Sequence, residues 1–276
     1  MKRIPSGISD LDSILNGGLP AGSVVLLFTE IGAGAIEFAY TASAKILKVK
    51  ETPEDLAIIL GDNCKEAVLP EEIFYLTISR SKEDILEEVK MSFNQDYYDA
   101  INSSLNFKDL SESYFRRTMV PSSWTGSSGG NIFSNNGGTD LLTELVDFLD
   151  AHASDNIVII DSLTDLLTNS NIDTEKLVTI VKGMRRASKS WGGIVYLLLS
   201  KGIVEKSVEY LLTDSVDGVI SFEWSKSYTT SQRQRYMTVE KFMSVLPHIK
   251  KEKISRFTAE VTSYAGYHVT NYEYIR

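Results

Sequence analysis

The sequence predicts an α/β protein of three layers, in which helices cover both faces of a central, mainly parallel sheet that ends in an antiparallel C-terminal meander. Three observations favour this architecture. Strand-length apolar runs alternate with helical patterns through most of the chain, as in repeated β–α units. The runs Asn156–Asp161 and Ile194–Ser200 are apolar almost throughout, which is typical of parallel strands covered on both faces. From Val216 onward, strand patterns follow one another without helices between them.

The first half of the chain carries two such units. The predicted elements are, in order, a strand at Val24–Phe28, a helix at Glu37–Lys48, a strand at Ile73–Ser79, a helix at Glu83–Met91 and a short strand that opens at Leu105. The helices are assigned from apolar residues that recur on one face, and the strands from short apolar runs between polar segments. A polar stretch at 51–70 connects the two units.

A Gly-, Ser- and Asn-rich segment at 125–139 separates the two halves and is predicted to be a flexible surface loop. Thr139 at its end is a candidate N-cap for a helix over Asp140–His152, whose leucines form an apolar stripe. A helix over Asp173–Trp191 then connects the two central strands. We find no internal repeat, and the simplest interpretation is a single domain over residues 1–276.

The C-terminal part is predicted to contain strands only. They are Val216–Trp224, Gln232–Leu246, Phe257–Tyr264 and His268–Ile275. We interpret them as consecutive antiparallel neighbours that complete the sheet.

Composition and charge exclude several classes of function. The formal net charge of −9 argues against a nucleic-acid-binding surface, because phosphate contacts require clustered cations, and the basic groups at 182–189 and 250–256 are interpreted as solvated faces. No apolar run approaches the roughly 20 residues of a membrane span, and the N-terminus does not have a signal-peptide pattern. The single cysteine, Cys64, fits a reducing cytoplasm and is expected in a surface loop. The histidines show no metal-ligand spacing, so we expect a cytoplasmic protein without a metal site.

Residues Thr29–Ile36, T-E-I-G-A-G-A-I, have the position of a phosphate-binding loop between a strand and a helix. In the P-loop pattern G-x-x-x-x-G-K-[ST], the Lys reaches the β- and γ-phosphates and the hydroxyl binds Mg²⁺. Here Ala35 replaces the Lys and Ile36 replaces the hydroxyl residue. The helix N-terminus still offers an anion site, because its donors are backbone amides. These belong to Gly32, Ala33, Gly34, Ala35 and Ile36.

The segment before this loop carries a family resemblance. Residues 4–23, I-P-S-G-I-S-D-L-D-S-I-L-N-G-G-L-P-A-G-S, closely resemble the opening of the KaiC-like and RadA-like ATPases of the RecA superfamily. In that family a T-G-[IV]-x-x-L-D-x-[IL]-[LI]-x-G-G-[LI]-x-x-G segment leads into the P-loop strand. The likeness covers nearly the whole chain, and the chain is most similar to archaeal HTR-like KaiC-type proteins, whose P-loop likewise ends in G-A-G-A. The resemblance implies a RecA-like fold and four catalytic positions.

Three of those four positions are changed. At the P-loop, both working side chains are replaced. On the second strand, Ser79 and Arg80 stand where the family has two glutamates that activate the attacking water, and neither is a general base at neutral pH. Asp161 keeps the Walker B aspartate. In the C-terminal K-M-R motif, which in the family reaches the nucleotide of a neighbouring subunit, Lys241 keeps the Lys and Met243 replaces the Arg.

The pairing of Arg80 with Asp161 decides how the altered site is interpreted. The neighbouring strands are expected to bring the two side chains together. Arg80 then either forms an ion pair that fills the metal site or supplies a positive charge to a phosphate. We favour the ion pair, because a buried carboxylate without Mg²⁺ or a cation is unstable. Asp161 has a third interpretation, as a cap of the helix that begins near Ser162.

Two functions of different classes remain. The first is a non-catalytic pseudo-ATPase that acts as a regulatory or signalling module by binding another protein or itself, without cofactor, metal or small-molecule substrate. Catalytic groups of this kind contribute on the order of 10³–10⁵ in rate, so their loss predicts no ATP hydrolysis. The alternative is a nucleotide-binding ATPase whose site is completed by Arg80 or a partner subunit, with weak binding of ATP and Mg²⁺. Both place the nucleotide site, vestigial or working, at Gly32, Ala33, Gly34, Ala35, Ile36, Arg80, Asp161 and Lys241. A monomer or small oligomer indifferent to ATP is expected in the first case.

Overall fold

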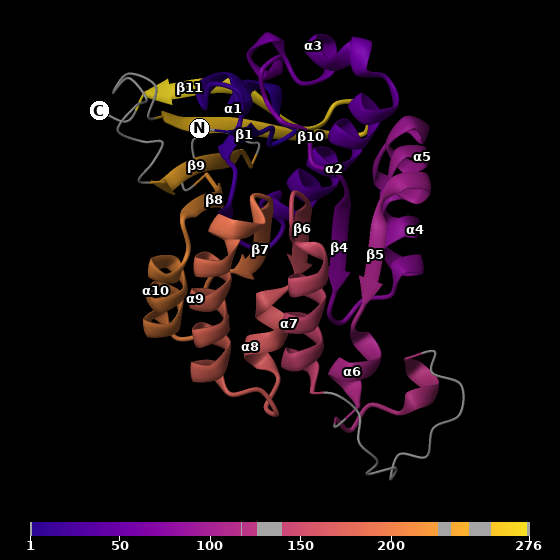
Figure 1. Cartoon of the computed structure of the whole chain (residues 1–276), viewed down its shortest axis with the longest axis vertical. Coiled ribbons are helices and arrows are strands. Elements are labelled where there is room, and N and C mark those ends of the chain that lie inside the picture. Colours follow the sequence, from indigo (N-terminus) through magenta and orange to yellow (C-terminus); the bar gives the residue numbers. More distant parts are fainter. Residues whose placement is uncertain (1, 117, 126–139, 226–232, 243–254, 275–276) are drawn as a thin grey trace.

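The computed structural model describes residues 2–116, 118–125, 140–225, 233–242 and 255–274, and within them it has three layers (Figure 1). The middle layer is a sheet whose strands lie in the order β11-β10-β9-β8-β3-β7-β6-β4-β5. Their bounds are β3 (Ser23–Thr29), β4 (Ile73–Thr77), β5 (Asn106–Asp109), β6 (Ile157–Asp161), β7 (Ile194–Ser200), β8 (Gly218–Trp224), β9 (Arg235–Phe242), β10 (Ser255–Thr262) and β11 (Gly266–Tyr274). A separate two-stranded sheet pairs β1 (Arg3–Ile4) with β2 (Leu19–Pro20).

The sheet is mainly parallel, as predicted. Strands β3 to β8 pair in parallel, and β9, β10 and β11 are antiparallel. One detail of the prediction was wrong, because we assigned Val216–Trp224 to the antiparallel meander. Its strand β8 pairs in parallel with β3 on one side and antiparallel with β9 on the other. The antiparallel part therefore begins one strand later.

Helices cover both faces of the sheet. One layer contains α1 (Ser9–Ile14), α2 (Ala35–Glu51), α3 (Leu56–Ile59), α4 (Lys82–Ser92) and α5 (Gln95–Ser104). The other contains α7 (Leu141–His152), α8 (Leu163–Thr168), α9 (Thr174–Trp191) and α10 (Lys206–Ser215), and α6 (Ser111–Phe115) follows β5. Alternate residues of β3 enter different cores, because successive side chains of a strand point to opposite faces: Val25 and Leu27 join the α2 side, whereas Val24 and Leu26 join the α9 side. No helix in the described ranges is both long and apolar enough to cross a membrane.

Some local predictions need correction, and others fall outside the described residues. Cys64 is buried rather than in a surface loop, and its thiol donates to the carbonyl of Leu60. The structure begins α7 after Asp140 as N-cap; Thr139, our candidate, lies outside the described residues together with most of the 125–139 segment. Met243 also lies outside them. The helix after Asp161 is capped by Ser162, whose hydroxyl accepts the amide of Asp165, so Asp161 is not its cap.

The N-terminal segment is fastened to the helix that carries the phosphate-binding loop. The carboxylate of Asp12, fully buried in α1, accepts the amides of Ser6 at 2.7 Å and Gly7 at 3.1 Å. Gly7 has φ +80°, and a Cβ there would lie 2.5 Å from the Cα of Ala42 in α2, so only glycine allows this approach. The motif at 4–23 therefore positions α2 by direct backbone contact.

Asp12 is expected to make stability depend on pH. Burial raises its pKa from 3.8 to about 7, so the folded protein holds this proton more tightly than the unfolded chain does. Stability from this group is present at low pH and is lost as pH rises from about 4 to about 7, by on the order of 2–4 kcal/mol. Urea unfolding at pH 5 and pH 8 measures the loss. In Asp12→Asn the difference between the two pH values should shrink by at least half; an unchanged difference would show that another group is responsible.

Candidate functional site

The predicted phosphate-binding loop has the expected backbone geometry. It leaves β3 at Thr29, passes through Gly32 with φ +72° and Gly34 with φ +117°, and enters α2 at Ala35. Within the described part of the chain, no acceptor reaches the amide nitrogens of Gly32, Gly34, Ala35 and Ile36. These donors, at the positive end of a 17-residue helix, keep the backbone part of an anion site.

The side chains at the end of the same loop are apolar and pack into the protein. Ala33 and Ala35 are buried, and Ile36 packs against the hydrophobic core on the α2 side of the sheet. The position that would hold a metal-binding hydroxyl thus takes part in the core. That this loop is a nucleotide site which has lost its working side chains stays a prediction.

Residues of the C-terminal strands β8 and β9 contact the first part of the loop, residues Glu30–Gly32. The indole of Trp224, at the end of β8, donates to the carbonyl of Ile31 at 3.0 Å, and its backbone amide donates to the Glu30 carboxylate at 2.8 Å. Arg235 on β9 donates from Nε to the carbonyl of Gly32 at 3.3 Å. Arg233 and Arg235 both stack on the Trp224 ring, with 4.8 and 4.7 Å to its centroid. Glu30, Ile31 and Gly32 are therefore fixed by contacts within the chain.

The ring of Tyr267 on β11 packs against the phosphate-binding loop at Gly34. A Cβ at Gly34 would lie 2.7 Å from its ring, so the loop and the ring are in direct contact. The ring packs against Phe38 and Phe222, and burial raises the pKa of its hydroxyl. That hydroxyl has no hydrogen-bond partner among the described residues. The contact requires glycine at position 34, independently of any phosphate.

Arg80 and Asp161 form the ion pair that the sequence predicted. Strand β4 pairs with β6 so that Thr77 lies beside Asp161, which brings the residues after both strands together. The guanidinium of Arg80 donates to Oδ2 of Asp161 at 2.6 Å. Asp161 is 8% exposed, so this carboxylate is buried and its charge is balanced by Arg80.

Two buried tyrosines complete this cluster. The Tyr75 hydroxyl donates to the same oxygen of Asp161 at 2.7 Å, and the Tyr40 hydroxyl of α2 accepts from Arg80 at 2.9 Å. On its solvent side Arg80 also pairs with Glu88 of α4 at 2.5 Å. Burial by itself would lower the pKa of the Arg80 guanidinium. Tyr40 and Asp161 outweigh the effect of burial, so the pKa is raised. Burial, and then the charge of Asp161, raise the pKa of Tyr75.

This arrangement does not fit Mg²⁺. A magnesium ion needs oxygen ligands at about 2.0–2.1 Å, but Oδ2 of Asp161 already accepts from both Arg80 and Tyr75, at 2.6 and 2.7 Å. Ile36 offers no hydroxyl. Within the described ranges, no group of three or more His, Cys, Asp or Glu side chains is placed to hold a metal.

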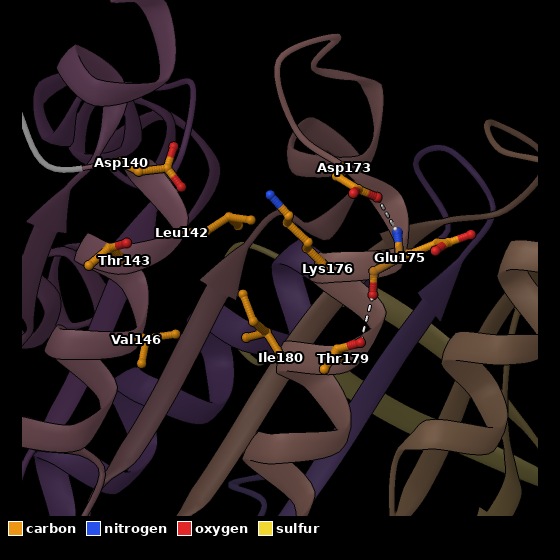
Figure 2. Close-up of a pocket in the computed structure, with 9 residues that line it drawn as sticks. All are labelled: Asp140, Leu142, Thr143, Val146, Asp173, Glu175, Lys176, Thr179 and Ile180. Atoms are coloured by element: carbon orange, nitrogen blue, oxygen red, sulfur yellow. Dashed lines mark hydrogen bonds between the residues drawn. The ribbon is translucent and has the colours of Figure 1, made fainter.

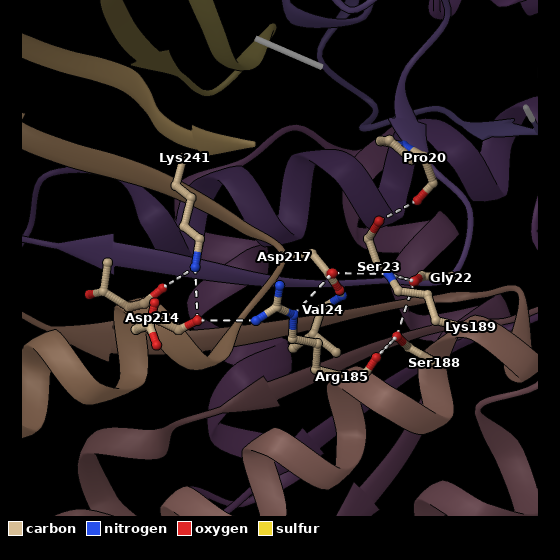
Figure 3. Close-up of polar contacts among 11 residues, drawn as sticks. Pro20, Gly22, Ser23, Val24, Arg185, Ser188, Lys189, Asp214, Asp217 and Lys241 are labelled. Carbon is tan, nitrogen blue, oxygen red and sulfur yellow. Dashed lines mark hydrogen bonds and ion pairs between the residues drawn. The ribbon is translucent and has the colours of Figure 1, made fainter. Parts of the chain in front are cut away.

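Lys241 lies apart from the other predicted site residues. It pairs with Val219 at the beginning of β8, whereas the phosphate-binding loop follows the end of β3. Since β3 and β8 are parallel, the two lie toward opposite ends of these strands. Its ammonium donates to the carbonyls of Thr213 and Asp214 at the end of α10, at 2.9 and 2.8 Å (Figure 3). Lys241 therefore caps the C-terminal end of α10 in this chain.

The basic residues predicted on α9 are partly neutralised by an acidic residue near the beginning of β3 and β8. Arg185 and Lys189 both pair with the carboxylate of Asp217, at 3.3 and 2.9 Å (Figure 3). Asp217 also accepts the amide of Val24 and so joins α9 to the beginning of β3. These two cations therefore take part in contacts within the fold, whereas we had interpreted the group at 182–189 as a solvated face.

Seven residues that contact the site were missed at the level of sequence: Tyr40, Tyr75, Glu88, Trp224, Arg233, Arg235 and Tyr267. Tyr40 and Tyr75 carry a weak signal, because a buried tyrosine hydroxyl usually needs a partner. Arg233 and Arg235 alternate within the predicted strand Gln232–Leu246, which would place them on one face, although β9 begins only at Arg235. Which face, and the pairing of Trp224 with Arg235, depend on the strand register, which spacing alone does not give.

No protein-family model and no curated protein matches the chain. Two solved structures are similar to it over nearly their whole length. The flagellar accessory protein FlaH from Methanocaldococcus jannaschii has a TM-score of 0.63 and 15% sequence identity, covering 95% of this chain and 95% of that one. The KaiC-like protein PH0186 from Pyrococcus horikoshii OT3 has a TM-score of 0.61 and 17% identity, covering 98% and 99%. At these identities the likeness shows the fold, and it confirms the RecA-like three-layer sandwich.

Proposed function

We propose that this protein is a pseudo-ATPase: a RecA-like module that does not hydrolyse ATP and that acts by binding another protein. The observation that carries the proposal is the Arg80–Asp161 ion pair, which replaces the metal at the Walker B carboxylate. The apolar residues Ala35 and Ile36 support it, since neither a γ-phosphate cation nor a metal-binding hydroxyl remains.

The regulatory part of the proposal follows from what the fold retains. The loop is fixed by Trp224, Arg235 and Tyr267, so it keeps its shape without a nucleotide. A rigid RecA-like body that needs no ligand suits a docking module. On the resemblance of residues 4–23, we place it with HTR-like KaiC-type proteins of archaea, in a signalling or regulatory role. We expect a monomer or small oligomer whose assembly does not respond to ATP.

A second candidate is a metal-independent nucleotide site. The observation that favours it is the pair Arg233 and Arg235, two guanidiniums beside a loop whose amides have no acceptor in the described part of the chain. They would supply the charge that Ala35 lacks. ATP binding in EDTA that is lost in Arg235→Ala would support this candidate, whereas Arg235→Lys should retain part of it.

The proposed absence of hydrolysis is tested by phosphate release from purified protein with Mg·ATP. We expect the wild-type protein to release phosphate no faster than two controls, the Asp161→Asn variant and a heat-denatured sample of the wild type. Arg80 and Asp161 have no catalytic role in this account, so their variants should not change the signal. Turnover in the wild type that disappears in Asp161→Asn would show a working ATPase and refute the proposal.

A further inference from the structure

A groove of about 560 Å³ lies between α7 and α9, on the sheet face opposite to α2. Its walls come from the first two turns of the two helices and from their N-cap residues, Asp140 and Asp173. Figure 2 shows Leu142 and Val146 of α7 pointing across the groove toward Lys176 and Ile180 of α9. None of these residues belongs to the phosphate-binding loop or to the Arg80 cluster.

The floor of the groove is apolar and partly open. Val146 is 41% exposed although it lies on a helix that buries four leucines, and Ile180 is half-buried. One turn further along α9, a Cβ added at Gly183 would meet nothing within 4 Å, so the helix surface is open there. Positions 176, 180 and 183 follow one stripe of α9, so the open surface beside Ile180 runs along the helix axis.

The rim of the groove is acidic. Asp140, Asp173 and Glu175 are exposed, and among the described residues none of their carboxylates has a cationic partner. Lys176 is the single cation in the lining. Carboxylates near helix N-termini stabilise the helices, and Asp173 caps α9 by accepting the amide of Glu175. Asp140 makes no such capping bond, so capping does not account for the whole rim.

We propose that this groove, defined by Asp140, Leu142, Val146, Glu175 and Ile180, binds a basic amphipathic helix of a partner protein. Two adjacent helices offer a groove into which the apolar side chains of a third helix pack at i, i+3, i+4 and i+7. Lysines or arginines beside them meet the unpaired carboxylates, which gives the occupant its charge. The net charge of −9 favours a basic partner in general. The rim carboxylates, which have no cationic partner among the described residues, favour binding of that partner at this groove. This inference rests on the proposed function as a docking module and names the class of its partner.

Fluorescence anisotropy tests the inference with a labelled Leu/Lys peptide of about 18 residues that has leucines at helical spacing, long enough for about five turns. The full-length protein is compared with Asp140→Asn/Glu175→Gln, which removes two rim charges, and with Val146→Ser/Ile180→Ser, which removes the apolar floor. Glu83→Gln/Glu87→Gln on α4 is the matched control, since it removes two exposed charges on the other side of the sheet. A Leu/Glu peptide of the same pattern controls for charge.

We expect the Leu/Lys peptide to bind the wild type and the α4 control within twofold of each other. Each groove variant should bind about tenfold more weakly, and binding should weaken in high salt. Equal affinity in all four proteins, no binding to the wild type, or equal binding of the Leu/Glu peptide would overturn the proposal. Self-association of the wild type that Val146→Ser/Ile180→Ser abolishes would assign the groove to a second copy instead. Phosphate release from the same samples tests the proposed function separately, so the two failures are distinguishable.

Discussion

Replacing Arg80 with methionine is expected to lower the free energy of unfolding by about 2–4 kcal/mol. The change leaves the carboxylate of Asp161 buried with only the Tyr75 hydroxyl as partner. Removing one partner of a buried ion pair typically lowers the free energy of unfolding by about 3–5 kcal/mol. We expect somewhat less, because Tyr75 still donates to Asp161 and the Arg80 side chain is 31% exposed. Urea denaturation at pH 7 measures the loss.

Two further variants separate this ion pair from the other contacts of Arg80. Glu88→Gln removes the partner on the solvent side, whose side chain is 44% exposed, and should change stability by no more than about 1 kcal/mol. Arg80→Met/Asp161→Asn removes both charges but keeps an acceptor for Tyr75, so it should be clearly milder than Arg80→Met alone. If the double variant is as unstable as the single one, the ion pair is not what stabilises this region.

Restoring the lost side chains is expected to separate nucleotide binding from hydrolysis. Ala35→Lys/Ile36→Thr should tighten ATP binding at least about tenfold, because the backbone of the loop is already in place. It should not restore turnover, since Arg80 still pairs with the carboxylate of Asp161. Adding Ser79→Glu and Arg80→Glu should then raise single-turnover phosphate release by on the order of 10²–10⁴, the usual contribution of a general base.

Asp161→Asn in the quadruple variant is the control for that experiment. It should abolish the new turnover, because the restored metal site depends on this carboxylate. Turnover in Ala35→Lys/Ile36→Thr equal to that of the quadruple variant would show that Ser79 and Arg80 do not stand at the water-activating position. Far-ultraviolet circular dichroism checks that each variant is folded.

The sequence predicted the parallel core and the altered loop, because both depend on local patterns. Apolar runs such as Ile157–Ile160 and the N-terminal motif at 4–23 are continuous in the chain, and their positions followed from it. The Arg80–Asp161 pair was predictable once the two strands were assigned, since the carboxyl ends of parallel neighbours meet.

The remaining features depend on contacts between distant segments. Helix α10 was missed, because we assigned no element between the strands Ile194–Ser200 and Val216–Trp224. Strand β8 was placed in the meander because spacing does not reveal strand direction. The contacts of Trp224 and Arg235 with the loop join residues about 200 positions apart, at 3.0 and 3.3 Å. The groove between α7 and α9 likewise requires the relative position of two helices, which no local pattern provides.

Calorimetric titration of ATP into the wild-type protein, in Mg²⁺ and in EDTA, tests most directly whether Arg80 has replaced the metal. Since Asp161 Oδ2 is engaged by Arg80 and Tyr75, we predict that Mg²⁺ leaves the affinity for ATP unchanged within about twofold. A dissociation constant that tightens tenfold or more on addition of Mg²⁺, and no longer does so in Asp161→Asn, would contradict the account.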